Sequence, residues 1–163
     1  MAIYAADKLI AQARALAAEY RRTMGKPLPG VSKEVAEYDA MQLLELEPRP
    51  EGENGYDAVD PARAGKRIQI KSRMLPDDAR TSPRIGQIRM DHDWDSVVLV
   101  LMNEDYEPVE ILEVDRDELL EYRDKSSSSR AKRGALSVAR FRIIGRLLWT
   151  AENGREADAW SNR

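Results

Sequence analysis

The sequence lacks cysteine altogether and has one histidine, His92, among its 163 residues. Without cysteine there can be no disulfide bond and no thiolate metal site, which suits a reducing environment, so we expect a cytoplasmic protein. A single histidine excludes zinc fingers and catalytic sites built from a cysteine–histidine pair or from several histidines. Long apolar runs are missing too, since none approaches the roughly 18 residues that a membrane-spanning helix needs.

Two common sequence motifs are also absent. Neither GxxxxGKS/T nor GxGxxG occurs, which excludes the usual glycine-rich phosphate-binding loops. The first residues do not have the basic-then-apolar layout of a secretion signal. The composition, with 42% hydrophobic and 34% charged residues, is that of a soluble globular protein. We expect one domain over residues 1–153, with its core in residues 33–114, and a flexible tail over residues 154–163.

Charged residues are unevenly distributed, although the net charge is only −3. Residues 61–90 carry 8 basic and 2 acidic side chains, residues 91–124 carry 2 and 13, and residues 125–163 carry 9 and 3. Two basic blocks that flank an acidic one favour a nucleic-acid groove. The plain alternative is a solvated surface of mixed charge.

Three helices are predicted from apolar residues at helical spacing. The first covers residues 5–24, and we assign its stripe to the core: Leu9, Ala13, Leu16 and Tyr20. The second runs from residue 33 to about residue 45, with Ser32 as its N-cap. The last covers residues 137–150, and a shorter helix is expected to follow Asp115.

The central part of the chain predicts two strands joined by a tight connection. Residues 55–60 and 66–73 alternate polar and apolar side chains, and proline and glycine separate them. Because strand side chains repeat every two residues, Gln69 and Lys71 share one face of the second strand. A connection that is symmetric about Arg63 puts Asp57 opposite Gln69. An acid, an amide and an ammonium group then meet on one patch.

Two further strands complete the predicted sheet. Residues 97–102 are an unbroken apolar run, typical of a strand covered on both faces. Residues 109–114 are expected to return antiparallel beside them. The predicted fold is therefore a single α/β (α+β) domain, in which helices flank a central mixed sheet of about four to five strands.

A carboxylate on the second predicted helix needs an explanation. Glu37 falls inside the apolar stripe of that helix, and burying a charge is costly unless it is paired or binds a metal. Glu34 lies one turn earlier, at the edge of the stripe, where an acid can stabilise the helix N-terminus. We favour Glu37 as a functional acid and keep Glu34 as the alternative.

These residues resemble the PD-(D/E)XK, or restriction-endonuclease-like, nuclease superfamily. Its signature is an aspartate on one strand and acid-x-Lys on the next, and here the tripeptide reads Gln69-Ile70-Lys71. The spacing Glu37-x-x-Ala40-x-x-x-Leu44 is similar to the glutamate-bearing first core helix of many members. The resemblance covers about half of the chain and implies an α-β-β-β-α-β core. The segment after residue 73 has room for only a short crossover helix, around residues 84–91, which departs from the pattern.

The resemblance also implies roles for these residues around Mg²⁺ or Mn²⁺. Asp57 would be the main metal ligand beside the backbone carbonyl of Ile70, and Glu37 would hold the metal or its waters. Gln69 would offer an amide oxygen in place of a carboxylate, so weaker metal affinity is expected. Lys71 would orient the attacking water and stabilise charge on the phosphate. The phosphate backbone would contact basic residues of the same strand, namely Lys66, Arg67 and Arg73.

Two functions therefore stay open. One is a metal-dependent endonuclease that hydrolyses phosphodiester bonds in DNA, in restriction, repair or mobile-element biology. The other is a catalytically degenerate member of the same fold, which binds nucleic acid or a protein partner without cutting. The expected partner is nucleic acid, DNA before RNA, with no membrane, and a homodimer stays open beside a monomer.

Overall fold

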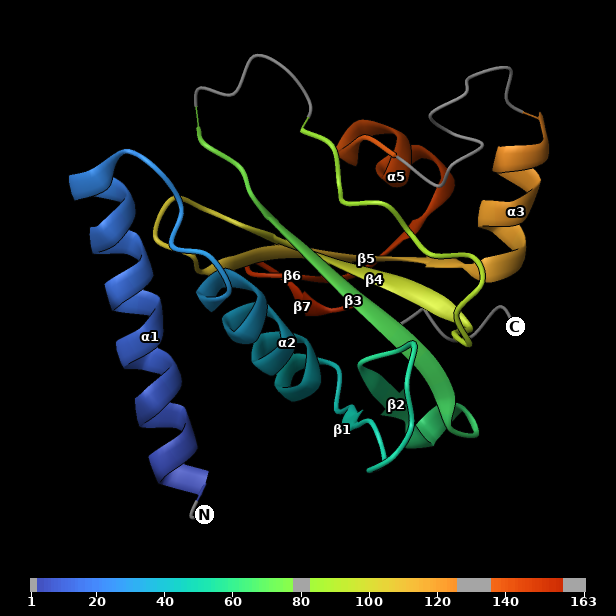
Figure 1. The fold of residues 1–163 in the computed structure, drawn as a ribbon, viewed down its shortest axis with the longest axis horizontal. Helices are drawn as coiled ribbons and strands as arrows, with labels where there is room; N and C mark the ends of the chain where they lie inside the picture. The colour runs from blue at the N-terminus through green and yellow to red at the C-terminus, as the bar shows by residue number, and fades with distance from the viewer. Residues whose placement is uncertain (1–2, 78–82, 126–135, 157–163) are drawn as a thin grey trace.

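The computed structural model describes residues 3–77, 83–125 and 136–156, which form one α+β domain (Figure 1). A single mixed sheet of seven strands runs in the order β1-β2-β3-β4-β5-β6-β7. The strands are β1 Glu47–Pro48, β2 Ala58–Asp60, β3 Lys66–Met74, β4 Ser96–Met102, β5 Pro108–Asp115, β6 Arg146–Thr150 and β7 Gly154–Arg155. The helices are α1 Ile3–Met24, α2 Val31–Leu43, α3 Arg116–Lys125 and α5 Val138–Ile144, with a 3-10 turn at Pro61–Arg63. Within the described ranges, no helix is both long and apolar enough to cross a membrane.

The sheet has one parallel pair, β3 with β4, and every other neighbouring pair is antiparallel. β4 is buried along its whole length, as its unbroken apolar run predicts. The pairing of β2 with β3 ends where Ala58 lies opposite Ile68. Beyond that point β3 continues to Met74, and among the described residues β4 is its only strand partner there. This second half of β3 therefore has an open edge toward the side of β2.

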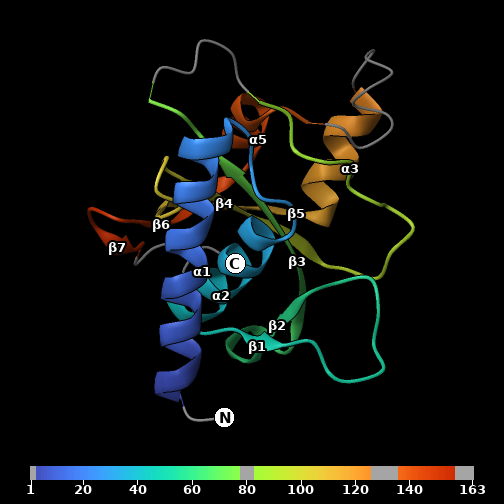
Figure 2. The same ribbon diagram turned by 60° about the vertical axis from the view of Figure 1, so that its left-hand side comes forward.

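Two hydrophobic clusters cover the two faces of the sheet. Figures 1 and 2 show α1 and α2 on one face and α3 and α5 on the other. On the first face Ala36, Ala40 and Leu44 of the α2 region share a cluster with Ile68 and Ile70 of β3. The second face has a cluster of its own, centred on Trp94, Leu99, Leu119 and Phe141. The stripe predicted for the second helix is thus core, and it fixes α2 against β3.

α2 begins two residues earlier than predicted. Its N-cap is Gly30, which has a φ of 84° and provides no side-chain cap. A positive φ is easily adopted by glycine alone, so the chain turns sharply into the helix at this residue. Ser32 is therefore not the cap that the sequence suggested, because it lies inside the first turn.

The packing of α1 also differs from the predicted core stripe. Leu9 and Leu16 are 54% and 57% exposed, so the predicted core stripe is only partly used. The helix packs instead through the small side chains of Ala17 and Ala18, which are buried. Arg14 anchors it with two hydrogen bonds of 2.7 and 2.8 Å to the Asp39 carboxylate of α2.

The remaining corrections concern the C-terminal half and the strand count. The predicted helix over residues 137–150 ends at Ile144, and its second half forms β6. Residues 154–155, assigned to a tail, form β7 beside β6, whereas residues 157–163 lie outside the described residues. Two short strands and β6 raise the sheet from the predicted four to five strands to seven. Residues 84–91 contain a single bridge, from Arg84 to Ser137, in place of the short crossover helix.

Candidate active site

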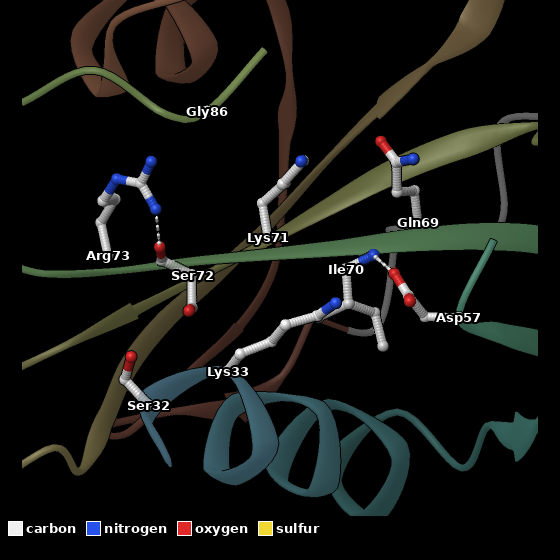
Figure 3. Close-up of a pocket in the computed structure, with 9 residues that line it drawn as sticks. All are labelled: Ser32, Lys33, Asp57, Gln69, Ile70, Lys71, Ser72, Arg73 and Gly86. Carbon is white, nitrogen blue, oxygen red and sulfur yellow. Dashed lines mark hydrogen bonds between the residues drawn. The ribbon is translucent and has the colours of Figure 1, made fainter. Parts of the chain in front are cut away.

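Asp57 lies at the point where β2 stops covering β3. Its backbone N–H donates to the Ile68 carbonyl at 2.8 Å, which continues the ladder and brings Asp57 opposite Gln69, as the symmetric connection predicts. Its carboxylate accepts a 2.7 Å hydrogen bond from the Ile70 N–H on the open edge (Figure 3). In a β-strand the N–H and the C=O of one residue point to the same side of the strand. The Ile70 carbonyl therefore points to this edge, as its N–H does.

A cavity of about 360 Å³ lies along the open edge. Five of the predicted site residues line it, and four further residues complete the wall: Asp57, Gln69, Ile70, Lys71, Arg73, and then Ser32, Lys33, Ser72, Gly86. Figure 3 shows Gln69, Lys71 and Arg73 on the side of the strand that faces Gly86, and Ser32 and Lys33 on the side of α2. The cavity therefore straddles the edge strand, with donors from both faces.

Gln69 has an unused acceptor in this cavity. Its Oε1 atom is buried and has no hydrogen-bond partner among the described residues. An unsatisfied buried acceptor costs about 1–3 kcal/mol, so it calls for a water, a donor or a cation. The Asp57 carboxylate lines the same cavity, and carboxylate, amide and carbonyl oxygens are the ligands that Mg²⁺ prefers.

Glu37 approaches the site from α2, on the sheet face opposite to Lys71. Its side chain is 19% exposed, and its carboxylate lies 3.6 Å from the Lys33 ammonium. Burial raises the pKa of Glu37, and the negative charge of Asp57 raises it further, against the lowering effect of Lys33. Glu37 therefore interacts electrostatically with Asp57, but it is not among the residues that line the cavity, and it does not share a face of the sheet with Lys71. Glu34, the alternative acid, is exposed and lies outside the cavity lining.

Lys71 extends from β3 into the cavity. Its ammonium reaches the backbone carbonyl of Gln87 at 3.5 Å. Burial lowers the pKa of Lys71; the charge of Asp57 opposes this, whereas the positive charges of Lys33 and Arg73 add to it. A desolvated ammonium next to a carboxylate is the kind of group that is used to hold a water or a phosphate oxygen.

The three predicted phosphate contacts do not share one surface. Arg73 lines the cavity, but Arg67 forms an ion pair with Asp95, with an N–O distance of 3.2 Å. Lys66 lies on the other face of β3 and contacts the Asp115 carboxylate at 2.6 Å. These two cations lie outside the cavity lining and are paired with carboxylates of their own, and their contact with nucleic acid stays a prediction.

The first basic block is largely neutralised within the fold. Arg63, next to β2, forms ion pairs with Asp60 and with Glu113 of β5. Arg89 forms an ion pair with Asp91. Basic residues of segment 61–90 therefore neutralise acidic residues of neighbouring segments, and the described part of this block offers the cavity only Lys71 and Arg73. Charge counting along the chain overstates the cationic surface.

Sequence reasoning missed the residues that form the α2 side of the cavity. Ser32 and Lys33 line it because α2 begins at Val31 and packs on β3 through its alanines. Gly86 was missed as well, and a side chain there would lie 3.6 Å from the Arg73 guanidinium. Neither the Ser32–Lys33 pair nor Gly86 belongs to a recognisable sequence motif. The one signal was a lysine and a serine directly before the stripe that holds Glu37.

Comparisons with known proteins do not identify the site. No protein-family model matches the chain, and a search of curated proteins finds no match either. Among the described residues, no group of three or more histidine, cysteine, aspartate or glutamate side chains is arranged to hold a metal ion. Asp57 is the one carboxylate in the cavity lining and Glu37 lies outside it, so a metal here would also need neutral oxygen donors.

Proposed function

We propose that this protein is a metal-dependent endonuclease that hydrolyses phosphodiester bonds in DNA. The observation that carries the proposal is the open edge of β3, where one cavity is lined by the Asp57 carboxylate, the partnerless Gln69 amide oxygen and the Lys71 ammonium. Hard oxygen donors next to a desolvated cation suit a hydrated divalent metal and a phosphate.

The order of elements also supports a PD-(D/E)XK nuclease. α2 is followed by three antiparallel strands, β1 to β3, and then by β4 parallel to β3, which agrees with the α-β-β-β and final-strand order of that superfamily. Residues 83–95 of the connection contain no helix, so the chain departs from the family pattern at this place. We base the proposal on the site and treat the topology as support.

Each residue of the proposed site has a defined task. Mg²⁺ or Mn²⁺, when bound, would polarise the phosphate and lower the pKa of a water. Asp57, Gln69 Oε1 and the Ile70 carbonyl would hold the ion, and Glu37 would accept hydrogen bonds from its waters. Lys71 would hold the attacking water and offset the charge that develops on the phosphate oxygens. Gln69 is neutral, so the ion would be held less tightly than by three carboxylates.

A second function follows from the same neutral residue. With Asp57 as the one carboxylate in the cavity lining, the protein could bind nucleic acid or a protein partner without cutting it. The partly desolvated Lys71 and the half-buried Glu37 favour the enzyme, because such groups cost stability that a purely structural edge would not need. The cytoplasmic location expected from the sequence belongs to this proposal.

Supercoiled plasmid provides the first test. The purified protein should nick it in Mg²⁺ or Mn²⁺ but not in EDTA. Asp57→Ala should abolish nicking and weaken Mn²⁺ binding measured by calorimetry, whereas Asp7→Ala, on exposed α1, should do neither. No nicking in either metal, together with DNA binding that survives EDTA, would favour the non-cutting alternative.

A further inference from the structure

We propose that Arg73 forms a subsite for the phosphate next to the one that is cleaved, so that the substrate strand runs along the open edge of β3. The inference rests on the proposed function, because it assigns the metal end of the cavity to the scissile phosphate. It adds a substrate class: a polynucleotide with at least two phosphates, as opposed to a mononucleotide or a simple phosphodiester.

The guanidinium of Arg73 is the first observation. It donates to two backbone carbonyls, of Arg84 at 2.8 Å and of Ser72 at 2.6 Å. No carboxylate of the described residues forms an ion pair with it, in contrast to Arg63 and Arg67 nearby. Burial lowers the pKa of Arg73, with no opposing contribution from an acid. Its positive charge is therefore partly buried and not neutralised, and an anion would be stabilised beside it.

The surroundings of Arg73 supply further anion contacts. The hydroxyl-bearing residues Ser32 and Ser72 line the same cavity, and so does Lys33 from the first turn of α2. The N-terminal end of a helix adds a partial positive charge. The Lys33 ammonium, however, lies 3.6 Å from the Glu37 carboxylate and extends toward Ile70 (Figure 3). Asp57 is bonded to Ile70, three residues before Arg73, so the Asp57 carboxylate and the Arg73 guanidinium occupy different positions along the edge.

Spacing along β3 connects these two positions. Lys71 and Arg73 point to the same side of the strand (Figure 3), two residues apart. Two residues of an extended strand cover about 7 Å. That length is close to the separation of successive phosphates in a nucleic-acid strand, so both cations can contact adjacent phosphates of one chain. A free phosphate ion or a mononucleotide could occupy only one of the two places.

Hydrolysis of two substrates, each measured in Mn²⁺, distinguishes phosphate binding at Arg73 from the catalytic step. Bis(4-nitrophenyl) phosphate has one phosphate, and a 12-nucleotide DNA has many. Arg73→Gln should raise KM for the oligonucleotide about tenfold, the loss expected for one charge-assisted phosphate contact, and should reduce hydrolysis of the single-phosphate diester much less. Arg22→Gln, an exposed arginine on α1, should change neither. Equal losses on both substrates, or no loss on the oligonucleotide, would overturn the inference.

A binding measurement keeps the inference testable if the protein does not cleave. Fluorescence anisotropy with the same labelled DNA in Ca²⁺ should show the tenfold loss for Arg73→Gln, with the salt dependence of log K reduced by about one. Arg73→Lys keeps the charge and should retain more affinity than Arg73→Gln, which also guards against misfolding. Inorganic phosphate should compete only at far higher concentration. Unchanged affinity in Arg73→Gln would reject the subsite, whether or not the wild type cuts DNA.

Discussion

Gln69 decides how strongly the cavity can hold a cation. Its buried Oε1 has no partner among the described residues, and it stands one residue before the Ile70 carbonyl. A glutamate at this position would keep the shape and add one negative charge next to the proposed ion. The choice of an amide over a carboxylate is therefore testable by a single substitution.

Gln69→Glu should tighten Mn²⁺ binding at least tenfold, because a third carboxylate joins Asp57 and Glu37 around the ion. Calorimetric titration measures this directly. Gln69→Leu removes the oxygen and should weaken binding, so the two variants bracket the wild type. Equal affinity for all three proteins would show that Gln69 does not contact the metal.

Glu37 should make the stability of the fold depend on pH. Its pKa is raised in the fold, chiefly by burial, so the folded protein holds this proton more tightly than the unfolded chain does. Stability therefore falls as the pH rises from the ordinary glutamate range to the raised pKa, and the whole cost is present at neutral pH. In EDTA at pH 7, Glu37→Gln should raise the Tm by a few degrees, the effect of about 1 kcal/mol in a domain of this size.

The gain should vanish in acid, below the ordinary glutamate pKa, where wild-type Glu37 is protonated in both states. Glu34→Gln, on the exposed side of the same helix, should leave the Tm unchanged at every pH. A lower Tm for Glu37→Gln at pH 7 would mean that Glu37 stabilises the fold, and the reason for assigning it a function would be lost.

At the scale of secondary structure, one buried carboxylate links three parts of the sheet. Glu113 on β5 is fully buried and accepts hydrogen bonds from Arg63, at the β2–β3 connection, and from Arg146 of β6. Burial alone would raise the pKa of Glu113, but the bond from Arg63 and the charges of Arg63, Arg146 and Lys66 outweigh it and hold the pKa below its usual range. This pairing positions the connection that leads into β3.

Glu113→Gln should destabilise the protein by about 3–5 kcal/mol at neutral pH, because it leaves buried cations without their partner. The stability that wild-type Glu113 supplies is present above the ordinary glutamate pKa and is lost as the pH falls through its lowered pKa. Urea unfolding at several pH values measures both effects. Glu110→Gln, whose partner Arg142 is 45% exposed, should cost under about 1 kcal/mol. Similar losses for both variants would contradict this account.

Secondary structure was predicted best where the pattern of side chains also indicates what covers the element. β4 was identified because an unbroken apolar run requires cover on both faces, and the β2–β3 register followed from a short connection centred on Arg63. The α1 stripe was misassigned because helical periodicity indicates an apolar side but not what covers it. Residues 146–150 were taken as helix because a short apolar run fits either period, and pairing with β5 decided for a strand.

The candidate site likewise could be predicted only in part from the sequence. Alternation along β3 was enough to bring Gln69 and Lys71 to one face, and the register added Asp57. The same alternation puts Arg73, a predicted phosphate contact, on the face of Lys71, whereas Ser32 and Lys33 join the cavity only through tertiary packing, which puts the start of α2 against the open edge. The ion pairs of Lys66 and Arg67 could not be predicted, because their acidic partners come from distant positions in the chain, Asp115 and Asp95.

At the scale of the whole molecule, the fold holds a cation-rich edge within a chain of net charge −3. Many basic residues stabilise the sheet through ion pairs, whereas Lys71 and Arg73 line the cavity and form no ion pair among the described residues. A function at this edge should depend on Lys71 far more than on the overall charge of the protein.

The central claim is that the cavity at the open edge of β3 cleaves phosphodiester bonds. Plasmid nicking by the wild type and by Lys71→Ala, purified in parallel and incubated in Mn²⁺, tests it most directly. We expect the wild type to convert supercoiled plasmid to open circles and Lys71→Ala to be at least 100-fold slower, with an unchanged circular-dichroism spectrum and unweakened Mn²⁺ binding. Equal nicking by the two proteins would mean that the activity comes from another site or from a contaminant, and would contradict the claim.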